Sequence, residues 1–335
     1  MKGNFEKIRT TGSIFLPVVF VVVFLINLSF GTVNLNPVRI FQLLTEDTPE
    51  RYMIWNLRFP RVLMATLTGI ALSLVGNIFQ AIMKNPLVDP YLIGTSAGAS
   101  FGALLGIYFT VNAIAHVSIP TMSFLFAVIA STLTIILARK ETVVPTVHLV
   151  LSGVLISTMF SAGSMLLLNI ANRSLVTGHV WLFGSFSGLT FKDIILPAFS
   201  LSILIFLSFV LSKELDVMTL GEKEAKSLGV NVELLKWLFY LLGSFVTAAF
   251  VSKTGIIGFV GLIVPHMART IVGPKHRNNI LATILIGGML MSICDTLSRT
   301  LLNPVEIPVG IITSLIGAPF MFVLLKVKNN GKSLY

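Results

Sequence analysis

The sequence predicts an all-α integral membrane protein that crosses the bilayer about ten times as a single domain covering residues 1–335. Of its 335 residues, 55% are hydrophobic and only 11% are charged, and the mean hydropathy is +0.91. Soluble domains carry about 25% charged residues. Apolar segments of about 20 residues, the length that spans the hydrocarbon core, also recur along the whole chain. Because the segments between them are short, we expect no soluble domain.

Ten apolar segments meet or approach the spanning length. In chain order they are Ser13–Phe30, Phe59–Ile82, Tyr91–Phe109, Ile119–Leu137, Pro145–Ile170, Ile194–Leu211, Trp237–Ser252, Gly258–Val272, Ile280–Leu301 and Val309–Leu325. The seventh and eighth are short, and the glycine-rich stretch at 252–259 makes their boundary the least defined. An even number of spans places both ends of the chain on the same side.

The lysines and arginines predict the orientation, because cytoplasmic loops carry an excess of both. With the N-terminus inside, 16 of the 24 lie on the inner side. We therefore expect cytoplasmic N- and C-termini. The formal net charge of +10 then belongs mostly to residues that flank membrane spans, so we expect no nucleic-acid partner.

A charged segment, Asp216–Val230, interrupts the apolar chain. It cannot lie in lipid, and the charge bias places it in the cytoplasm. Its apolar positions fall at helical spacing, which predicts one or two short amphipathic helices over 214–230. A second weakly polar stretch, Ser174–Gly188, is too short to span, and we expect a short helix or re-entrant piece at the outer surface.

Four glycines, Gly94, Gly98, Gly102 and Gly106, recur every four residues in the third span. Small residues on one helix face let a neighbouring backbone approach closely, which is how membrane helices pack. The first of these glycines also opens a Gly-x-Ser-x-Gly pattern. That pattern marks a catalytic serine only on a strand-to-helix turn, so helix packing is the better interpretation.

No catalytic, metal or cofactor site is expected. The single cysteine, Cys294, lies in an apolar run, and His266 has no second histidine or carboxylate at metal-binding spacing. We interpret this histidine as a packed or interface side chain. The tripeptide 331–333 resembles the end of a phosphate-binding loop, but Lys326 stands where that motif needs glycine. Any energy source must therefore come from another subunit.

Charged residues stand near the ends of two spans. Arg58 and Arg61 flank the start of the second span, where they contact either lipid phosphates or the carboxylates of an acidic partner. Asp295 and Arg299 have the i, i+4 spacing that allows an ion pair on one helix face. Pairing with Asp295 and binding of a partner both remain open for Arg299.

Several motifs in order resemble the FecCD-type permeases of ABC importers for iron-siderophore, haem and cobalamin. The resemblance extends from about Leu35 to Leu325. The residues that carry it are Arg58-Phe59-Pro60-Arg61-Val62-Leu63, Asn85-Pro86-Leu87, Asp89-Pro90, Leu92-Ile93-Gly94, the run Gly255 to His266, and the groups Glu306-Ile307-Pro308-Val309-Gly310 and Gly317-Ala318-Pro319-Phe320.

The resemblance implies a type II ABC importer. In such an importer, two permease subunits, identical or paralogous, form a pathway at their interface above two ATP-binding cassette subunits, and an extracytoplasmic binding protein delivers the substrate. Residues 144–170, 174–188 and 309–325 would line the pathway. It also implies that Arg58, Arg61 and Arg299 dock the binding protein. The residues that would couple to the ATPase are Gly221, Glu222, Ala225, Leu228 and Gly229.

We therefore expect a multi-pass permease of the cell membrane, not an enzyme, that imports a bulky metal chelate. A ferric siderophore is the favoured substrate, and cobalamin or haem is the alternative. The rival class is a secondary transporter driven by an ion gradient, which would need ionisable groups at mid-membrane depth. Asp89 and Asp295 are the only candidates for that role, and both stand near predicted span ends.

Overall fold

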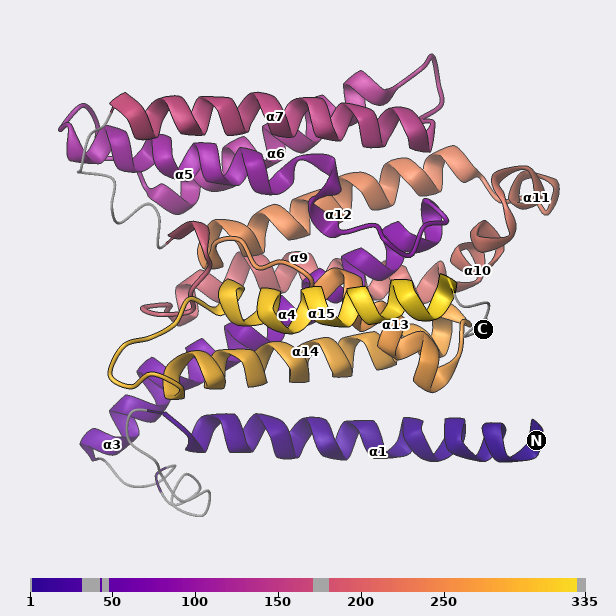
Figure 1. Cartoon of the computed structure of the whole chain (residues 1–335), viewed down its shortest axis with the longest axis horizontal. Coiled ribbons are helices and arrows are strands. Elements are labelled where there is room, and N and C mark those ends of the chain that lie inside the picture. The colour runs from indigo at the N-terminus through magenta and orange to yellow at the C-terminus, as the bar shows by residue number, and fades with distance from the viewer. Residues whose placement is uncertain (1, 32–42, 44–47, 171–180, 330–335) are drawn as a thin grey trace. The chain divides into compact units, whose positions relative to one another are not determined.

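The computed structural model describes residues 2–31, 43, 48–170 and 181–329 (Figure 1). Apart from one isolated bridge between Lys140 and Val143, the regular structure of these residues is helical. The helices are α1 (Lys2–Ser29), α3 (Pro49–Tyr52), the π-helix η1 (Met53–Arg58), α4 (Phe59–Ile82), the 3-10 helix η2 (Pro90–Ile93), α5 (Thr95–Val111), α6 (Ile119–Ala138), α7 (Thr146–Ile170), α9 (Phe191–Val210), α10 (Ser212–Leu220), α11 (Glu222–Ser227), α12 (Val232–Thr254), α13 (Val260–Val272), α14 (His276–Thr300) and α15 (Val309–Asn329).

Each of the ten apolar segments overlaps one long helix, and α4 has the expected bounds. Six helical stretches of the described chain are long and apolar enough to cross a membrane. Four more, within α1, α5, α13 and α15, are apolar but only 10–17 residues long. The structure therefore confirms the all-helical fold, whereas the number of ten spans and the orientation of the termini stay predictions.

The boundary between α12 and α13 is a five-residue break, 255–259. Gly255 ends α12 with φ of 72°, and Phe259 precedes α13 with φ of 70°. Both angles lie in the left-handed region, which is uncommon for a non-glycine residue. Helix α15 leaves room for the Phe259 side chain because it has glycine at position 317. A Cβ at Gly317 would lie only 2.4 Å from the Phe259 Cβ.

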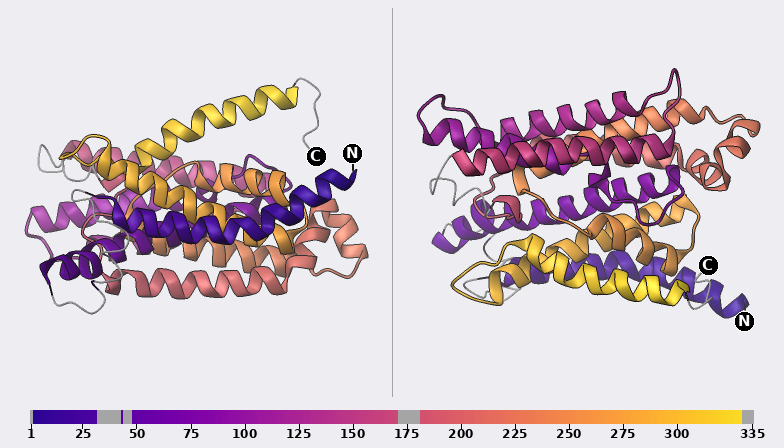
Figure 2. Two further views of the ribbon diagram at one scale, coloured as in Figure 1. Left: turned by 90° about the horizontal axis from the view of Figure 1, so that it is seen from below. Right: turned by 45° about the horizontal axis from the view of Figure 1, so that its top comes forward.

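The chain forms two compact units, each built from separate stretches. The first comprises Met1–Asn77, Phe186–Ala198 and Gly258–Tyr335, and the second comprises Ile78–Ser185 and Phe199–Ile257. In the first unit, α14 packs on α1, α13 and α15. In the second, α5 packs on α6 and α7, and α12 packs on α5 and α6, as the views of Figure 2 show.

Glycines bring helix backbones together in the first unit. A Cβ at Gly69 of α4 would lie 2.1 Å from the carbonyl oxygen of Gly287 in α14. A Cβ at Gly76, two turns further along α4, would lie at the same distance from the carbonyl oxygen of Gly261 in α13. Since no side chain fits at such a crossing, glycine at these two positions sets how closely α4 packs.

Two glycines of the sequence-predicted stripe have the same role in the second unit. A Cβ at Gly98 or Gly102 would lie 2.3 Å from a carbonyl oxygen of α6, that of Phe126 or Met122 respectively. Gly106 has only ordinary contacts, the nearest at 3.4 Å. Gly94 lies outside the helix and caps α5 with φ of 82°. The stripe therefore packs through its two central members.

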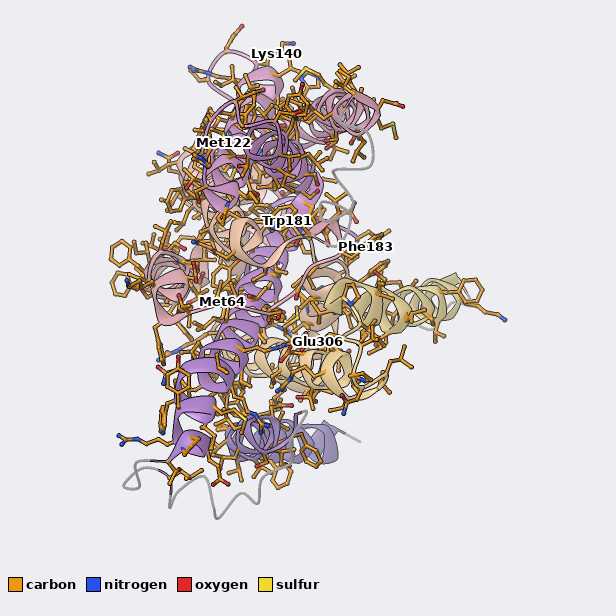
Figure 3. All side chains as sticks on the ribbon, turned by 90° about the vertical axis from the view of Figure 1, so that its left-hand side faces the viewer. Met64, Met122, Lys140, Trp181, Phe183 and Glu306 are labelled. Carbon is orange, nitrogen blue, oxygen red and sulfur yellow. The ribbon has the colours of Figure 1, made fainter. Side chains whose placement is uncertain are left out.

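Residues 181–188 of the 174–188 stretch are described. Residues 181–185 belong to the second unit and residues 186–188 to the first. Residues 171–180 lie outside the described residues, and with them the first part of this stretch, 174–180. Trp181, labelled in Figure 3, packs against a buried cluster of the second unit. That cluster consists of Ala99, Ala127, Ala248 and Val251.

Candidate functional site

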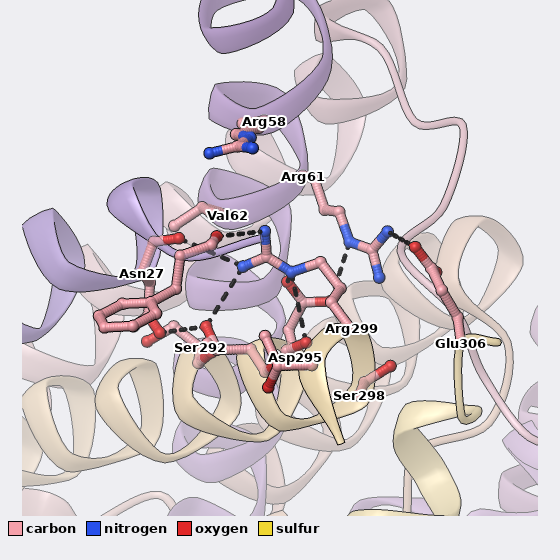
Figure 4. A network of polar contacts seen from close by, with 12 residues as sticks. Asn27, Arg58, Arg61, Val62, Ser292, Asp295, Ser298, Arg299 and Glu306 are labelled. Atoms are coloured by element: carbon pink, nitrogen blue, oxygen red, sulfur yellow. Dashed lines mark hydrogen bonds and ion pairs between the residues drawn. The ribbon is translucent and has the colours of Figure 1, made fainter. Parts of the chain in front are cut away.

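The three arginines singled out in the sequence lie together in the first unit (Figure 4). Arg58 ends η1 and Arg61 lies in the first turn of α4, whereas Arg299 lies in the last turn of α14. Their exposed fractions are only 6%, 9% and 5%. A π-helix at this point is a local irregularity of a kind that is frequent at functional sites.

Asp295 joins two of these arginines. One carboxylate oxygen lies 3.0 Å from Arg61 Nε, and the other lies 3.2 Å from Arg299 Nε. Arg61 also donates through Nη1 to Glu306 at 2.8 Å. The predicted i, i+4 pair of Asp295 and Arg299 is therefore confirmed. Because a buried charge is costly unless it is paired, these contacts hold Arg61 and Arg299 in fixed positions.

Two of the guanidinium groups also close the end of α1. Arg58 donates to the carbonyl oxygens of Leu28 and Ser29, both at 3.4 Å. Arg299 donates to the carbonyl oxygens of Asn27 and Phe30 at 3.2 and 3.1 Å. The last carbonyl groups of a helix have no partner within it and carry partial negative charge, so cationic donors stabilise them. The cluster thereby ties α1 to α4 and α14.

A cleft of about 360 Å³ opens beside this cluster. Its walls come from η1, the start of α4, the end of α14 and the stretch before α9. The residues lining it are Gly31, Met53, Asn56, Leu57, Arg58, Arg61, Ser187, Gly188, Leu189, Thr190, Arg299 and Glu306. The charged members are three arginines and one glutamate. With Asp295, which pairs with Arg61 and Arg299, three positive charges face two negative ones, so the cluster keeps one net positive charge. The arginines line the cleft from below the surface and are not freely exposed side chains.

The charged segment 214–230 forms two short helices in the second unit, the end of α10 and the whole of α11. Gly221 separates them with φ of 151°, a conformation that L residues rarely adopt. Ala225 is fully buried and Gly221 is buried. Leu228 is 64% exposed and Gly229 is also exposed. Of the five residues proposed for coupling, Leu228, Gly229 and the partly exposed Glu222 therefore offer a surface to a partner.

Charged side chains attach α11 to α12. Glu222 Oε1 lies 2.6 Å from Nζ of Lys236, and Lys226 Nζ lies 3.7 Å from Glu233 Oε1. Lys236 is only 1% exposed. The burial of this lysine was not predicted from the sequence, because a lysine at the start of a span is usually solvated. The available signal was its position three residues after Glu233, which puts both side chains on one face of α12.

Two of the remaining candidates, His266 and Cys294, lie in the described residues. The ring of His266 stacks edge-on against Phe320 with centroids 6.4 Å apart, and the described chain contains no cluster of three metal-binding side chains. Cys294 is buried. The tripeptide 331–333 lies outside the described residues.

Comparison with known proteins decides the family. A sequence model of the FecCD transport family matches residues 19–327. The chain belongs to this family. Its members are transport permease subunits and not enzymes, so the chain is a multi-pass permease of the cell membrane.

Relatives that are named for a substrate share about a third of the permease's residues. It is 36% identical to the cobalamin import permease BtuC of Halobacterium salinarum, over 82% of this chain and 73% of the relative. It is 33% identical to the ferric citrate permease YfmE of Bacillus subtilis, over 93% of each. It is 35% identical to the molybdate permease MolB of Haemophilus influenzae, over 94% of this chain and 96% of the relative.

A solved structure agrees with these relatives. It is described as an inward-facing conformation of a metal-chelate type ABC transporter, and the FecCD permease matches it with a TM-score of 0.83 at 32% identity. The match covers 94% of this chain and 98% of that one. The family and the fold are therefore shown, whereas relatives of similar identity carry different substrates.

Proposed function

We propose that this FecCD permease imports a ferric siderophore across the cell membrane, as one of two permease subunits driven by two separate ATPase subunits. A binding protein on the outer face delivers the siderophore. The observation that carries the proposal is the arginine cleft, which gives the permease a prebuilt surface for carboxylates at one end of its first unit. The ferric citrate relative supports a chelate of iron as the substrate.

The cleft suits docking of an acidic surface loop. Asp295 and Glu306 fix the guanidinium of Arg61, and Asp295 also fixes that of Arg299. An incoming carboxylate therefore meets donors that have already lost their rotamer freedom, which reduces the entropic cost of binding. Arginine can grip a carboxylate with two parallel hydrogen bonds. In this proposal Arg58, Arg61 and Arg299 dock the binding protein.

We expect Arg58→Gln to weaken binding of the binding protein roughly tenfold or more, since a charge pair in an interface contributes well over 1.4 kcal/mol. Arg58 is the variant of choice because Arg61 and Arg299 are ion-paired with Asp295, and their loss would disturb the fold. The measurement is the dissociation constant with the permease complex held in nanodiscs, at two salt concentrations.

The matched control for this test is Lys192→Gln. Lys192 is an exposed residue of the first unit that follows the cleft-lining stretch 187–190 without lining the cleft. Lys192→Gln removes one positive charge, as Arg58→Gln does. We expect the affinity of this variant for the binding protein to stay within about twofold of wild type, because an exposed charge contributes little. Equal affinities for wild type and Arg58→Gln would exclude the docking role.

The helices α10 and α11 are the proposed ATPase-docking surface on the cytoplasmic face. Leu220 and Leu228 are 62% and 64% exposed there, among charged residues. Exposed apolar side chains rimmed by charges mark interaction sites. Gly221, Glu222 and Ala225 support this surface from beneath, since the first two set the position of α11 and the third lets it pack closely.

The second permease subunit would meet the exposed apolar faces of α7 and α15. In α7, Val147, Leu151, Leu155 and Met159 recur every four residues and each is more than half exposed. In α15, Leu315 and Phe322 are at least two-thirds exposed. Side chains spaced by four share one helix face. An apolar face of this kind lets an amphipathic chelate pass without a tight binding site.

Transport by the reconstituted complex tests the proposed function directly. Proteoliposomes that contain the permease with its ATPase and binding protein are expected to accumulate a radiolabelled ferric siderophore only when ATP is supplied. Cobalamin, haem and molybdate serve as competing substrates. Uptake by the permease alone, driven by an ion gradient, would reveal a secondary transporter and overturn the proposal. ATP-driven uptake of cobalamin with none of the siderophore would keep the importer and replace its substrate.

A further inference from the structure

Within the second unit, charged side chains attach α11 to α12. Glu222 and Lys226 stand at i and i+4 of α11, so their side chains lie on one face. Their partners, Lys236 and Glu233, lie three residues apart on one face of α12. Two ion pairs of opposite polarity therefore join α11 to α12.

The same two residues of α12 also hold a third element. Lys236 Nζ donates to the carbonyl oxygen of Val144 at 3.2 Å, and Glu233 Oε2 accepts from the Val144 backbone N–H at 3.1 Å. Val144 is fully buried and lies two residues before α7 begins at Thr146. Lys236 and Glu233 of α12 thus each contact both α11 and Val144, the residue just before α7.

The connection that contains Val144 has little slack. It joins α6 to α7 through a turn in which Lys140 and Val143 exchange two backbone hydrogen bonds, of 2.9 and 3.1 Å. Glu141 within this turn has φ of 57°. The turn is labelled by Lys140 in Figure 3. On the other side, only Pro145 separates Val144 from α7, so a displacement of Val144 is passed to the first turn of α7.

Lys236 is the centre of this arrangement. Its ammonium group is nearly inaccessible to water, and a buried charge is stable only while its partners stay in place. If α11 moved while Lys236 stayed in place, Glu222 would separate from Lys236. The buried positive charge of the lysine would then lose its ion-pair partner. The favourable response is that Lys236, Val144 and the start of α7 follow α11.

We propose that Lys236 is a positioning residue for transport, which links α11 to the N-terminal end of α7 and converts a displacement of α11 into a displacement of α7. This inference rests on the proposed function, because it takes the ATPase as the source of the displacement. Lys236 itself touches neither the ATPase nor the substrate in this scheme. It acts through Glu222 on one side and the Val144 carbonyl on the other.

The test compares Lys236→Met with Lys236→Arg in the complete transporter, reconstituted with ATPase and binding protein. We expect Lys236→Met to retain the ATPase during purification, yet to transport at least fivefold less substrate per ATP hydrolysed. Lys236→Arg keeps the positive charge and should recover most of that ratio. Lys140→Met, which removes an exposed lysine from the turn beside Val144, is the matched control and should behave as wild type.

Two further variants make every outcome informative. Glu222→Gln removes the other half of the pair at a residue whose side chain is 39% exposed, and it should lower the transport ratio even if Lys236→Met does not fold. Leu228→Asp should release the ATPase from the permease. If Leu228→Asp retains the ATPase, the docking proposal fails. If it releases the ATPase while Lys236→Met and Glu222→Gln transport normally per ATP, only the role of Lys236 is overturned.

Discussion

Replacing Asp295 with alanine is expected to lower the free energy of unfolding of the permease by about 3–5 kcal/mol, the usual cost of breaking a buried ion pair. Asp295 is 1% exposed and compensates both Arg61 and Arg299. Without it, two guanidinium groups stand close together in a poorly solvated site. Denaturant unfolding of the purified protein in detergent, followed by tryptophan fluorescence, measures the change.

Glu306→Gln is the matched comparison for this prediction. Glu306 binds the same Arg61, but its side chain is 36% exposed, so water screens the pair. We expect a loss of at most about 1 kcal/mol, the range of exposed ion pairs. Equal losses for the two variants would show that burial does not set the strength of this network.

Alanine at Gly98 or Gly102 should destabilise the permease by about 1–3 kcal/mol, the range of overpacked cores. The new Cβ would stand 2.3 Å from a backbone carbonyl oxygen of α6, and a backbone atom cannot move aside as a flexible side chain can. The helices α5 and α6 must then separate along their contact. The measurement is the melting temperature of each purified variant in one detergent.

Gly106→Ala provides an internal control on the same helix. Its added Cβ would meet ordinary contacts at 3.4 Å or more, and alanine is a better helix former than glycine. Its melting temperature should therefore equal or exceed that of wild type. If all three variants melted alike, close approach of α6 would not be the reason for glycine at these positions.

The positions of the long helices could be predicted from the sequence, because the apolar length of each segment is a local property. Apolar length predicted α4 at its observed bounds, and Asn231, which accepts a hydrogen bond from the Leu234 N–H, explains why α12 begins five residues before its apolar segment. The π-helix η1 was not predicted. The amino-acid composition of Met53–Arg58 does not distinguish a π-helix from an ordinary α-helix.

The functional residues were predictable in identity but not in environment. The pair of Asp295 and Arg299 follows from a spacing of four along one helix, so the sequence could suggest it. The contact of Arg61 with Glu306 joins residues 245 positions apart, and no local pattern encodes it. The same holds for Lys236, whose burial depends on Val144 in another connection. Long-range packing decides which charges become buried and paired.

The interleaved order of the two units has a consequence for protein engineering. The chain changes unit four times, and two of these changes, at 77/78 and 198/199, fall inside the continuous helices α4 and α9. No single cut releases either unit as an intact fragment. A chimaera that exchanged one unit with a relative would need four junctions, two of them within helices. The permease is therefore expected to be inherited and recombined as a whole gene, not as separable modules.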